Sequence, residues 1–164
     1  MKQNKLVYAV SSALVILTIA ALGILPMTTG CKTLPSGQIT FDLPTAGRDL
    51  TLASKIGAYY AMQKDAKTRP IFQAVTSGLD LLISNNTVAA SALEATILPL
   101  VGTNANAQLA VMAGIGLYEA NFADAVAYGI ASNQVVATLL PALNSGFKQA
   151  LTLPMGQKAY SLKR

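Results

Sequence analysis

Residues 70–86 read PIFQAVTSGLDLLISNN. Apolar side chains recur in this stretch at intervals of three and four residues, at Ile71, Phe72, Val75, Leu79, Leu82 and Ile83. This spacing places them on one face of an α-helix and leaves the other face polar. Pro70 suits the first turn of a helix, and the pair Asn85-Asn86 marks its end. The stretch therefore predicts an amphipathic helix with one buried face.

Helical spacing continues on the N-terminal side. The side-chain oxygen of Asp49 or Thr51 can cap a helix there. That helix should end near Thr68, because residues that precede a proline avoid the helical region. The apolar positions expected on its buried face are Leu52, Ile56, Tyr59 and Tyr60.

Three further helices are expected on the C-terminal side, over residues 87–101, 106–131 and 134–151. Pro99 lies in the first and Pro141 in the last, where each is expected to bend the helix or weaken it. The core positions expected in the longest of the three are Leu109, Met112, Leu117, Phe122, Val126 and Ile130. Helices so rich in Ala, Gly and Ser are expected to pack with their backbones close together. The predicted fold class is all-α, a compact bundle of four to five helices.

Four segments are expected along the chain. Residues 1–30 form a signal peptide or membrane anchor, residues 31–48 a flexible tether, and residues 49–152 the helical bundle. Residues 153–164 form a basic C-terminal tail that is expected to be poorly ordered or to dock late. Ile39, Phe41 and Leu43 alternate within the tether as in a strand, but no second strand is evident. The tether is therefore expected to lie extended along the surface of the bundle.

The N-terminal segment has the pattern of an export signal. Lys2 and Lys5 precede an apolar run over residues 6–25, and Pro26 ends that run. The basic start stays on the cytoplasmic side of a membrane, so the remainder of the chain is expected to be carried outward. About twenty apolar residues are also just enough to span a membrane as a helix. Beyond this segment, no apolar run is expected to be both long and unbroken enough to span.

Residues 27–31 read MTTGC and contain the only cysteine of the chain, Cys31. This motif resembles the lipobox of bacterial lipoproteins, with Gly30 and Cys31 at its last two positions and Thr28 where Leu is usual. The resemblance implies that Cys31 is acylated on sulfur, that the signal is cut before it, and that the new amine is acylated. Lys32 follows the cysteine, which in that class favours an outer membrane. Two other readings are an uncleaved transmembrane anchor and a soluble intracellular protein.

Composition restricts the classes of function. Of the 164 residues, 52% are hydrophobic and only 12% charged, and the formal net charge is +5. Loss of Lys2 and Lys5 with the signal lowers that charge by two, to +3, which is too small to indicate nucleic-acid binding. A surface with so few charges suits packing against copies of the chain, a partner or lipid.

Residues typical of catalysis are scarce. The chain has no histidine, which removes the commonest general base and metal ligand. Glu119, beside Tyr118 and Asn121, is the one acidic cluster that stands out, and its plainer interpretation is a solvated polar patch. We therefore expect no catalytic, cofactor-binding or metal-binding residues, and Cys31 as the one modified site.

Three hypotheses of function follow. The leading one is a non-enzymatic lipoprotein of the bacterial envelope, encoded by a bacterium or a phage, with a structural or interaction role. Its partners would be membrane lipid through Cys31 and either an envelope protein or a second copy. The alternative is a membrane-perturbing, pore-forming or lysis protein, and the third is a cell-wall hydrolase acting through Glu119.

Overall fold

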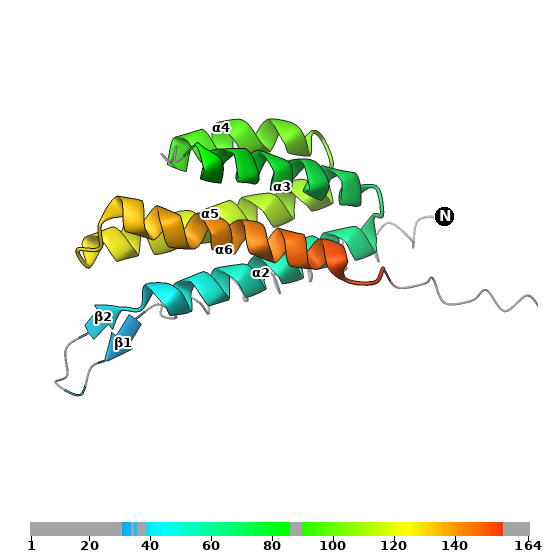
Figure 1. Cartoon of the computed structure of the whole chain (residues 1–164). Coiled ribbons are helices and arrows are strands. Elements are labelled where there is room, and N and C mark those ends of the chain that lie inside the picture. The colour runs from blue at the N-terminus through cyan, green and yellow to red at the C-terminus, as the bar shows by residue number, and fades with distance from the viewer. Residues whose placement is uncertain (1–30, 34, 36–38, 86–89, 156–164) are drawn as a thin grey trace, which may run out of the picture.

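The computed structural model describes residues 31–33, 35, 39–85 and 90–155. The expected signal or anchor and its lipobox-like residues before Cys31 lie outside these ranges, as does most of the basic tail. The described residues form two short strands and five helices (Figure 1). These elements are β1 Cys31–Thr33, β2 Ile39–Phe41, α2 Leu43–Lys64, α3 Thr68–Ser84, α4 Ala90–Val101, α5 Ala105–Ala127 and α6 Ser132–Thr152. The prediction of a compact all-α bundle is confirmed.

The helices are stacked in layers in Figure 1, with α3 and α4 on one side, α5 and α6 between, and α2 on the other. Helix α6 is central, because it packs against α2, α3 and α5. The core lies along its length. There the rings of Phe72 and Phe147 meet at 5.5 Å between centroids, and Tyr118, Leu79 and Leu143 are fully buried.

Helix α2 begins at Leu43, six residues before the predicted start. The carboxylate of Asp42 accepts hydrogen bonds from the backbone N–H of Thr45 at 3.3 Å and from its hydroxyl at 2.9 Å. Pro44 occupies the first turn, where its missing N–H removes no helical hydrogen bond. A capping residue followed by a proline was thus the true signal for the start of this helix.

The expected extended tether is also wrong in part. Strand β2 pairs antiparallel with β1, and Cys31 lies opposite Phe41 in the register. The second strand that the sequence did not reveal is therefore the segment beginning at Cys31. The tail begins with docked residues, since the Tyr59 hydroxyl donates to the Pro154 carbonyl at 3.3 Å.

The faces that the helices bury differ in how well the sequence predicted them. On α3, the predicted Phe72, Val75 and Leu79 are completely buried. On α2 and α5 the prediction is wrong in part. Tyr59, Leu117, Phe122 and Ile130 pack against the core as expected, but the other large side chains expected there are exposed. The exposed ones are Leu52, Ile56 and Tyr60 on α2, and Leu109, Met112 and Val126 on α5.

Close approach of the helix backbones explains why small side chains, rather than these large ones, lie at the contacts between helices. A Cβ added at Gly146 of α6 would lie 2.4 Å from the carbonyl oxygen of Thr51 on α2, and one at Gly57 would lie 3.7 Å from the Cβ of Ala110 on α5. Helices this close can bury only small residues along the line of contact. Ala46, Ser54, Ala58 and Ala61 of α2 accordingly lie inside.

Candidate functional site

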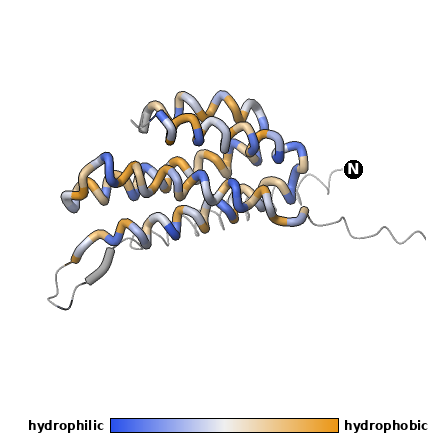
Figure 2. The backbone as a smooth tube through the Cα atoms, in the orientation of Figure 1, coloured by the Kyte–Doolittle hydropathy of each residue, from blue (hydrophilic) through white to orange (hydrophobic). Residues whose placement is uncertain are grey.

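Exposed apolar side chains of the described residues are concentrated on α2, α5 and the segments next to them. Figure 2 shows apolar positions in all five helices, so exposure rather than hydropathy distinguishes these two helices. Eight of the ten large hydrophobic side chains that are exposed belong to β2, α2, α5 or the residue after α5. They are Ile39, Leu52, Ile56, Tyr60, Leu109, Met112, Val126 and Tyr128, and the other two are Leu81 on α3 and Leu100 on α4.

Five of these side chains define what we call the apolar face: Leu52, Ile56 and Tyr60 of α2 with Leu109 and Met112 of α5. The two helices run antiparallel and side by side, because Gly57 faces Ala110 and Ser54 faces Gly114. The apolar residues of α2 and α5 therefore lie within about two helical turns of the same crossing. Their exposure ranges from 42% at Tyr60 to 58% at Ile56.

The charges near the apolar face are distributed unevenly. Helix α5 has no charged residue between Ala105 and Tyr118, and its acids Glu119 and Asp124 follow in its C-terminal half. Helix α2 carries Arg48, Lys55 and Lys64 against one acid within the helix. The Lys64 ammonium lies 5.3 Å from the centre of the Tyr60 ring, within range of a cation–π interaction. The border of the face on α2 is therefore basic.

The strand pair lies at one end of this side. The ring of Phe41, which pairs with Cys31 in the register, stacks on Tyr128 at 6.3 Å between centroids. Tyr128 directly follows α5, and Phe41 directly precedes the capping residue of α2. The backbone of Cys31 is thus held at the end of the bundle where α2 begins and α5 ends.

Helix α5 also meets the length and composition needed to cross a membrane. It has 23 residues, and only 33% of its most apolar window is buried inside the protein. Among the described residues it is the one helix that qualifies, against the expectation that no such segment follows the leader. Core helices of soluble proteins pass the same test, and α5 also buries one face, from Ala107 to Ala125, against the bundle.

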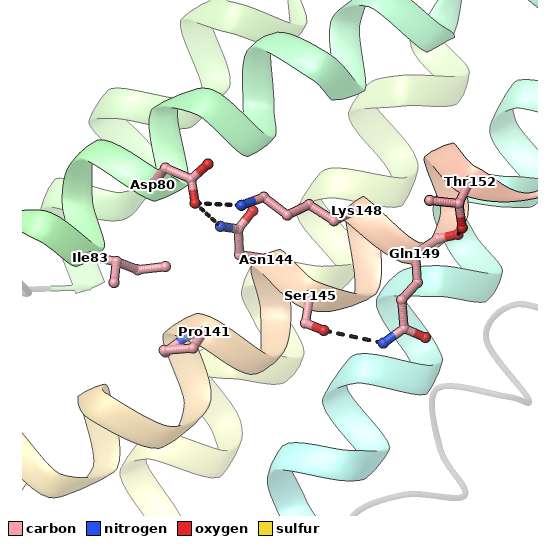
Figure 3. A pocket seen from close by; sticks show the side chains of 8 residues that line it. All are labelled: Asp80, Ile83, Pro141, Asn144, Ser145, Lys148, Gln149 and Thr152. Carbon is pink, nitrogen blue, oxygen red and sulfur yellow. Dashed lines mark hydrogen bonds and ion pairs between the residues drawn. The ribbon is translucent and has the colours of Figure 1, made fainter.

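A second feature is an open pocket of about 370 Å³ between α3 and α6 (Figure 3). Asp80 accepts hydrogen bonds from the Lys148 ammonium and from the side-chain amide of Asn144, both at 2.7 Å. These hydrogen bonds, the one from Lys148 first, lower the pKa of Asp80. The remaining lining residues are Ile83, Pro141, Ser145, Gln149 and Thr152. The charges satisfy each other, so the pocket offers neither an unpaired acid nor an unpaired base for chemistry.

The structure does not bring Tyr118 and Asn121 together with Glu119 in a catalytic site. The Tyr118 side chain is fully buried, and its hydroxyl has no hydrogen-bond partner among the described residues. Burial, with a smaller effect of the Glu119 charge, raises the pKa of Tyr118 to about 12. The Asn121 side chain is also buried and donates to the Leu117 carbonyl of its own helix at 2.8 Å. Glu119 is half-buried on a different side of α5.

The described residues hold no group of three or more Cys, Asp or Glu side chains placed to bind a metal ion. Of the sequence-predicted sites, Cys31 is placed by its backbone alone, at the start of β1. The apolar face was missed, because its residues were assigned to the core. The small residues at the alternative helical positions of α2, namely Ala46, Ser54, Ala58 and Ala61, were the signal that could have revealed it.

Comparisons with protein-family models, with curated proteins and with solved structures found no match to this chain. Function is therefore argued from the residues and the geometry of this chain alone.

Proposed function

We propose that the chain is an envelope lipoprotein of a bacterium or a phage, in which acylated Cys31 holds the helical bundle at a membrane. Its role is structural or by interaction, with another envelope protein or a second copy as partner. The observation that carries the proposal is the sequence of residues 27–31, MTTGC, directly after a basic start and an apolar run. The resemblance to the lipobox implies both the cleavage and the lipid. The residue that follows Cys31, Lys32, supports an outer membrane in a host that has one.

All of the described strands and helices lie after residue 30, so each of them remains in the chain that cleavage before Cys31 would leave. A non-enzymatic role is supported by the lack of histidine and by the dispersal of Glu119, Tyr118 and Asn121.

Metabolic labelling with an alkyne fatty acid tests the proposal. The wild-type chain is expected to take up the label and to sediment with membranes, and its N-terminal peptide is expected to have the mass of an acylated Cys31. Cys31→Ser should lose the label, whereas Thr33→Ser, two residues away in the same strand, should keep it. Label that persists in Cys31→Ser, or a wild-type mass with residues 1–30 attached and a free thiol, would contradict acylation.

A membrane-perturbing protein is the second candidate, and the character of α5 favours it. A helix of 23 residues with two thirds of its apolar window outside the core is able to insert if it leaves the bundle. Purified protein would then release dye from liposomes in proportion to its concentration. A lipoprotein that remains a folded bundle releases none, so this assay separates the two candidates.

A further inference from the structure

We infer that the apolar face formed by α2 and α5 rests on the lipid surface, with both helix axes parallel to the membrane. This inference deepens the proposed function and rests on it for the presence of an anchor at Cys31. It adds a second, non-covalent contact between protein and membrane, made by Leu52, Ile56 and Tyr60 with Leu109 and Met112.

The first argument is the extent of the exposed surface. Ile56 and Met112 expose 58% and 57% of their surface, although both belong to long regular helices of a packed bundle. Large apolar side chains scattered singly over a surface need no explanation, but five on two adjacent helices near one crossing make a candidate site of interaction. The two helices that carry this set are also direct neighbours.

The second argument is the chemistry at the border of the face. Tyr60 and Lys64 lie together, with the ammonium 5.3 Å from the ring centre. Tyrosine and lysine favour the level of the lipid headgroups, where an apolar ring or stem meets a polar tip. Arg48 and Lys55 on the same helix add positive charge, and each basic residue near an anionic surface is worth about 1 kcal/mol.

The third argument is the position of the anchor. Cys31 is paired with Phe41, and Phe41 stacks on Tyr128 at the end of α5. Acyl chains on Cys31 would therefore enter the bilayer next to the shared end of α2 and α5, without a long free tether between them. The anchor presents the same two helices to the lipid surface at high effective concentration. Exposed Ile39 and Val126 extend the apolar surface toward that end.

Lipid is favoured over a second copy as the occupant of the face. An acylated chain always has a bilayer beside Cys31, whatever the number of copies. The face also combines an apolar centre with a basic border on α2, which is the composition of a helix lying in a membrane interface. A dimer that buried the same face would bring the basic borders of two copies near one another.

The test uses the acylated protein in vesicles of phosphatidylethanolamine and phosphatidylglycerol. Ile56→Cys is labelled with an environment-sensitive fluorophore, because an acylated Cys31 has no thiol to react. The matched control is Leu81→Cys on α3, at a side chain that is 63% exposed and far from the apolar face. The label at position 56 is expected to shift to shorter wavelength and to be quenched by lipids carrying quenchers in their acyl chains. The label at position 81 is expected to show neither change.

A second arm removes the anchor. The Cys31→Ser chain from residue 31 onward, which lacks the apolar run over residues 6–25, is expected to retain measurable binding to the same vesicles, weakened by salt. Adding Ile56→Ser and Met112→Ser to it should lower the vesicle partition coefficient by about tenfold or more, since each change removes buried apolar surface. Adding Leu81→Ser instead should leave the coefficient unchanged.

The outcomes separate the inference from the proposed function. Absence of acyl mass on Cys31, with vesicle binding of Cys31→Ser retained, refutes the anchor and keeps the lipid-contacting face. Acylation with the same fluorescence at positions 56 and 81 refutes the face and keeps the anchor. A shift at position 56 that needs no vesicles and grows with protein concentration assigns the face to a second copy and overturns the inference.

Discussion

Replacing Gly146 by Ala tests the closest approach between helices in this structure. The added methyl carbon would lie 2.4 Å from the Thr51 carbonyl oxygen and 2.7 Å from the Ser54 Cβ. Both neighbours belong to α2 and one is a backbone atom, so α2 as a whole must shift to make room. Over-packing of this kind costs about 1–3 kcal/mol, and rigid neighbours favour the upper end of that range.

Gly116→Ala is the matched control. Gly116 lies inside α5 as Gly146 lies inside α6, but no atom lies within 4 Å of a Cβ added there. Both changes gain about 0.5–1 kcal/mol of helix propensity. We therefore expect the free energy of unfolding to rise by about 0.5–1 kcal/mol in Gly116→Ala. It should fall by about 1–2 kcal/mol in Gly146→Ala, where the clash outweighs the gain.

Urea unfolding followed by far-UV circular dichroism measures both variants. The experiment is best done on the Cys31→Ser chain from residue 31 onward, so that lipid does not contribute to stability. The difference between the two variants corresponds to several degrees in Tm for a domain of this size. Gly146→Ala with stability equal to or above that of Gly116→Ala would show that α2 and α6 are not in backbone contact at this point, and the account of the small-residue core would be wrong.

Three further predictions concern the core and the ion pair. Phe72→Ala is expected to lower the free energy of unfolding by about 3–5 kcal/mol, since its ring is fully buried against Phe147, and thermal unfolding measures this. Asp80→Asn is expected to cost less than about 1 kcal/mol at neutral pH, because the bond to Lys148 is half-exposed. The pKa of Asp80 is lowered from 3.8, so its contribution to stability is present above pH 3.8 and disappears as the pH falls through the folded-state pKa. The difference in unfolding free energy between the wild type and Asp80→Asn should therefore be present at neutral pH and vanish at acidic pH. Tyr118→Phe is expected to leave the free energy of unfolding unchanged or to raise it, because it removes a buried hydroxyl without a partner. It should also abolish the tyrosine absorbance step near pH 12. A clear loss of stability would instead reveal a hydrogen bond of that hydroxyl.

Much of the fold could be predicted from local chemistry. Helix α3 has a single apolar face, which contains Phe72, Val75 and Leu79, so burial of hydrophobic surface determines which side of the helix faces the core. Asn104, which accepts from the Ala107 N–H at 3.0 Å, marks the start of α5 within one residue of the expected position. Helix ends, capping residues and helices with one apolar face are determined by residues close together in the sequence, so they can be predicted from it.

The faces of α2 and α5 depend on neighbours far apart in sequence. Both helices carry large apolar residues on more than one side, so hydropathy alone does not decide which side is buried. The close approach at Gly146 and Gly57 places the small residues at the contacts between helices, and it arises only when the helices meet. The pairing of Cys31 with Phe41 was hidden for a related reason, because a strand of three residues carries almost no periodicity. The candidate site was missed through these two effects.

The carboxylate of Asp65 joins two turns of the chain that are far apart in sequence. It accepts a hydrogen bond from the Lys67 N–H at 3.0 Å, in the turn between α2 and α3, and one from the Asn104 amide at 2.9 Å, in the break between α4 and α5. These two bonds lower the pKa of Asp65, so the carboxylate keeps its charge, and both bonds, into more acidic solution than an ordinary aspartate. When a proton finally binds, the carboxyl loses its charge and one of its two acceptor oxygens becomes a donor, so both hydrogen bonds weaken together. Hydrogen exchange at the Lys67 and Ala107 amides should then accelerate together, as one cooperative opening at this end of the molecule.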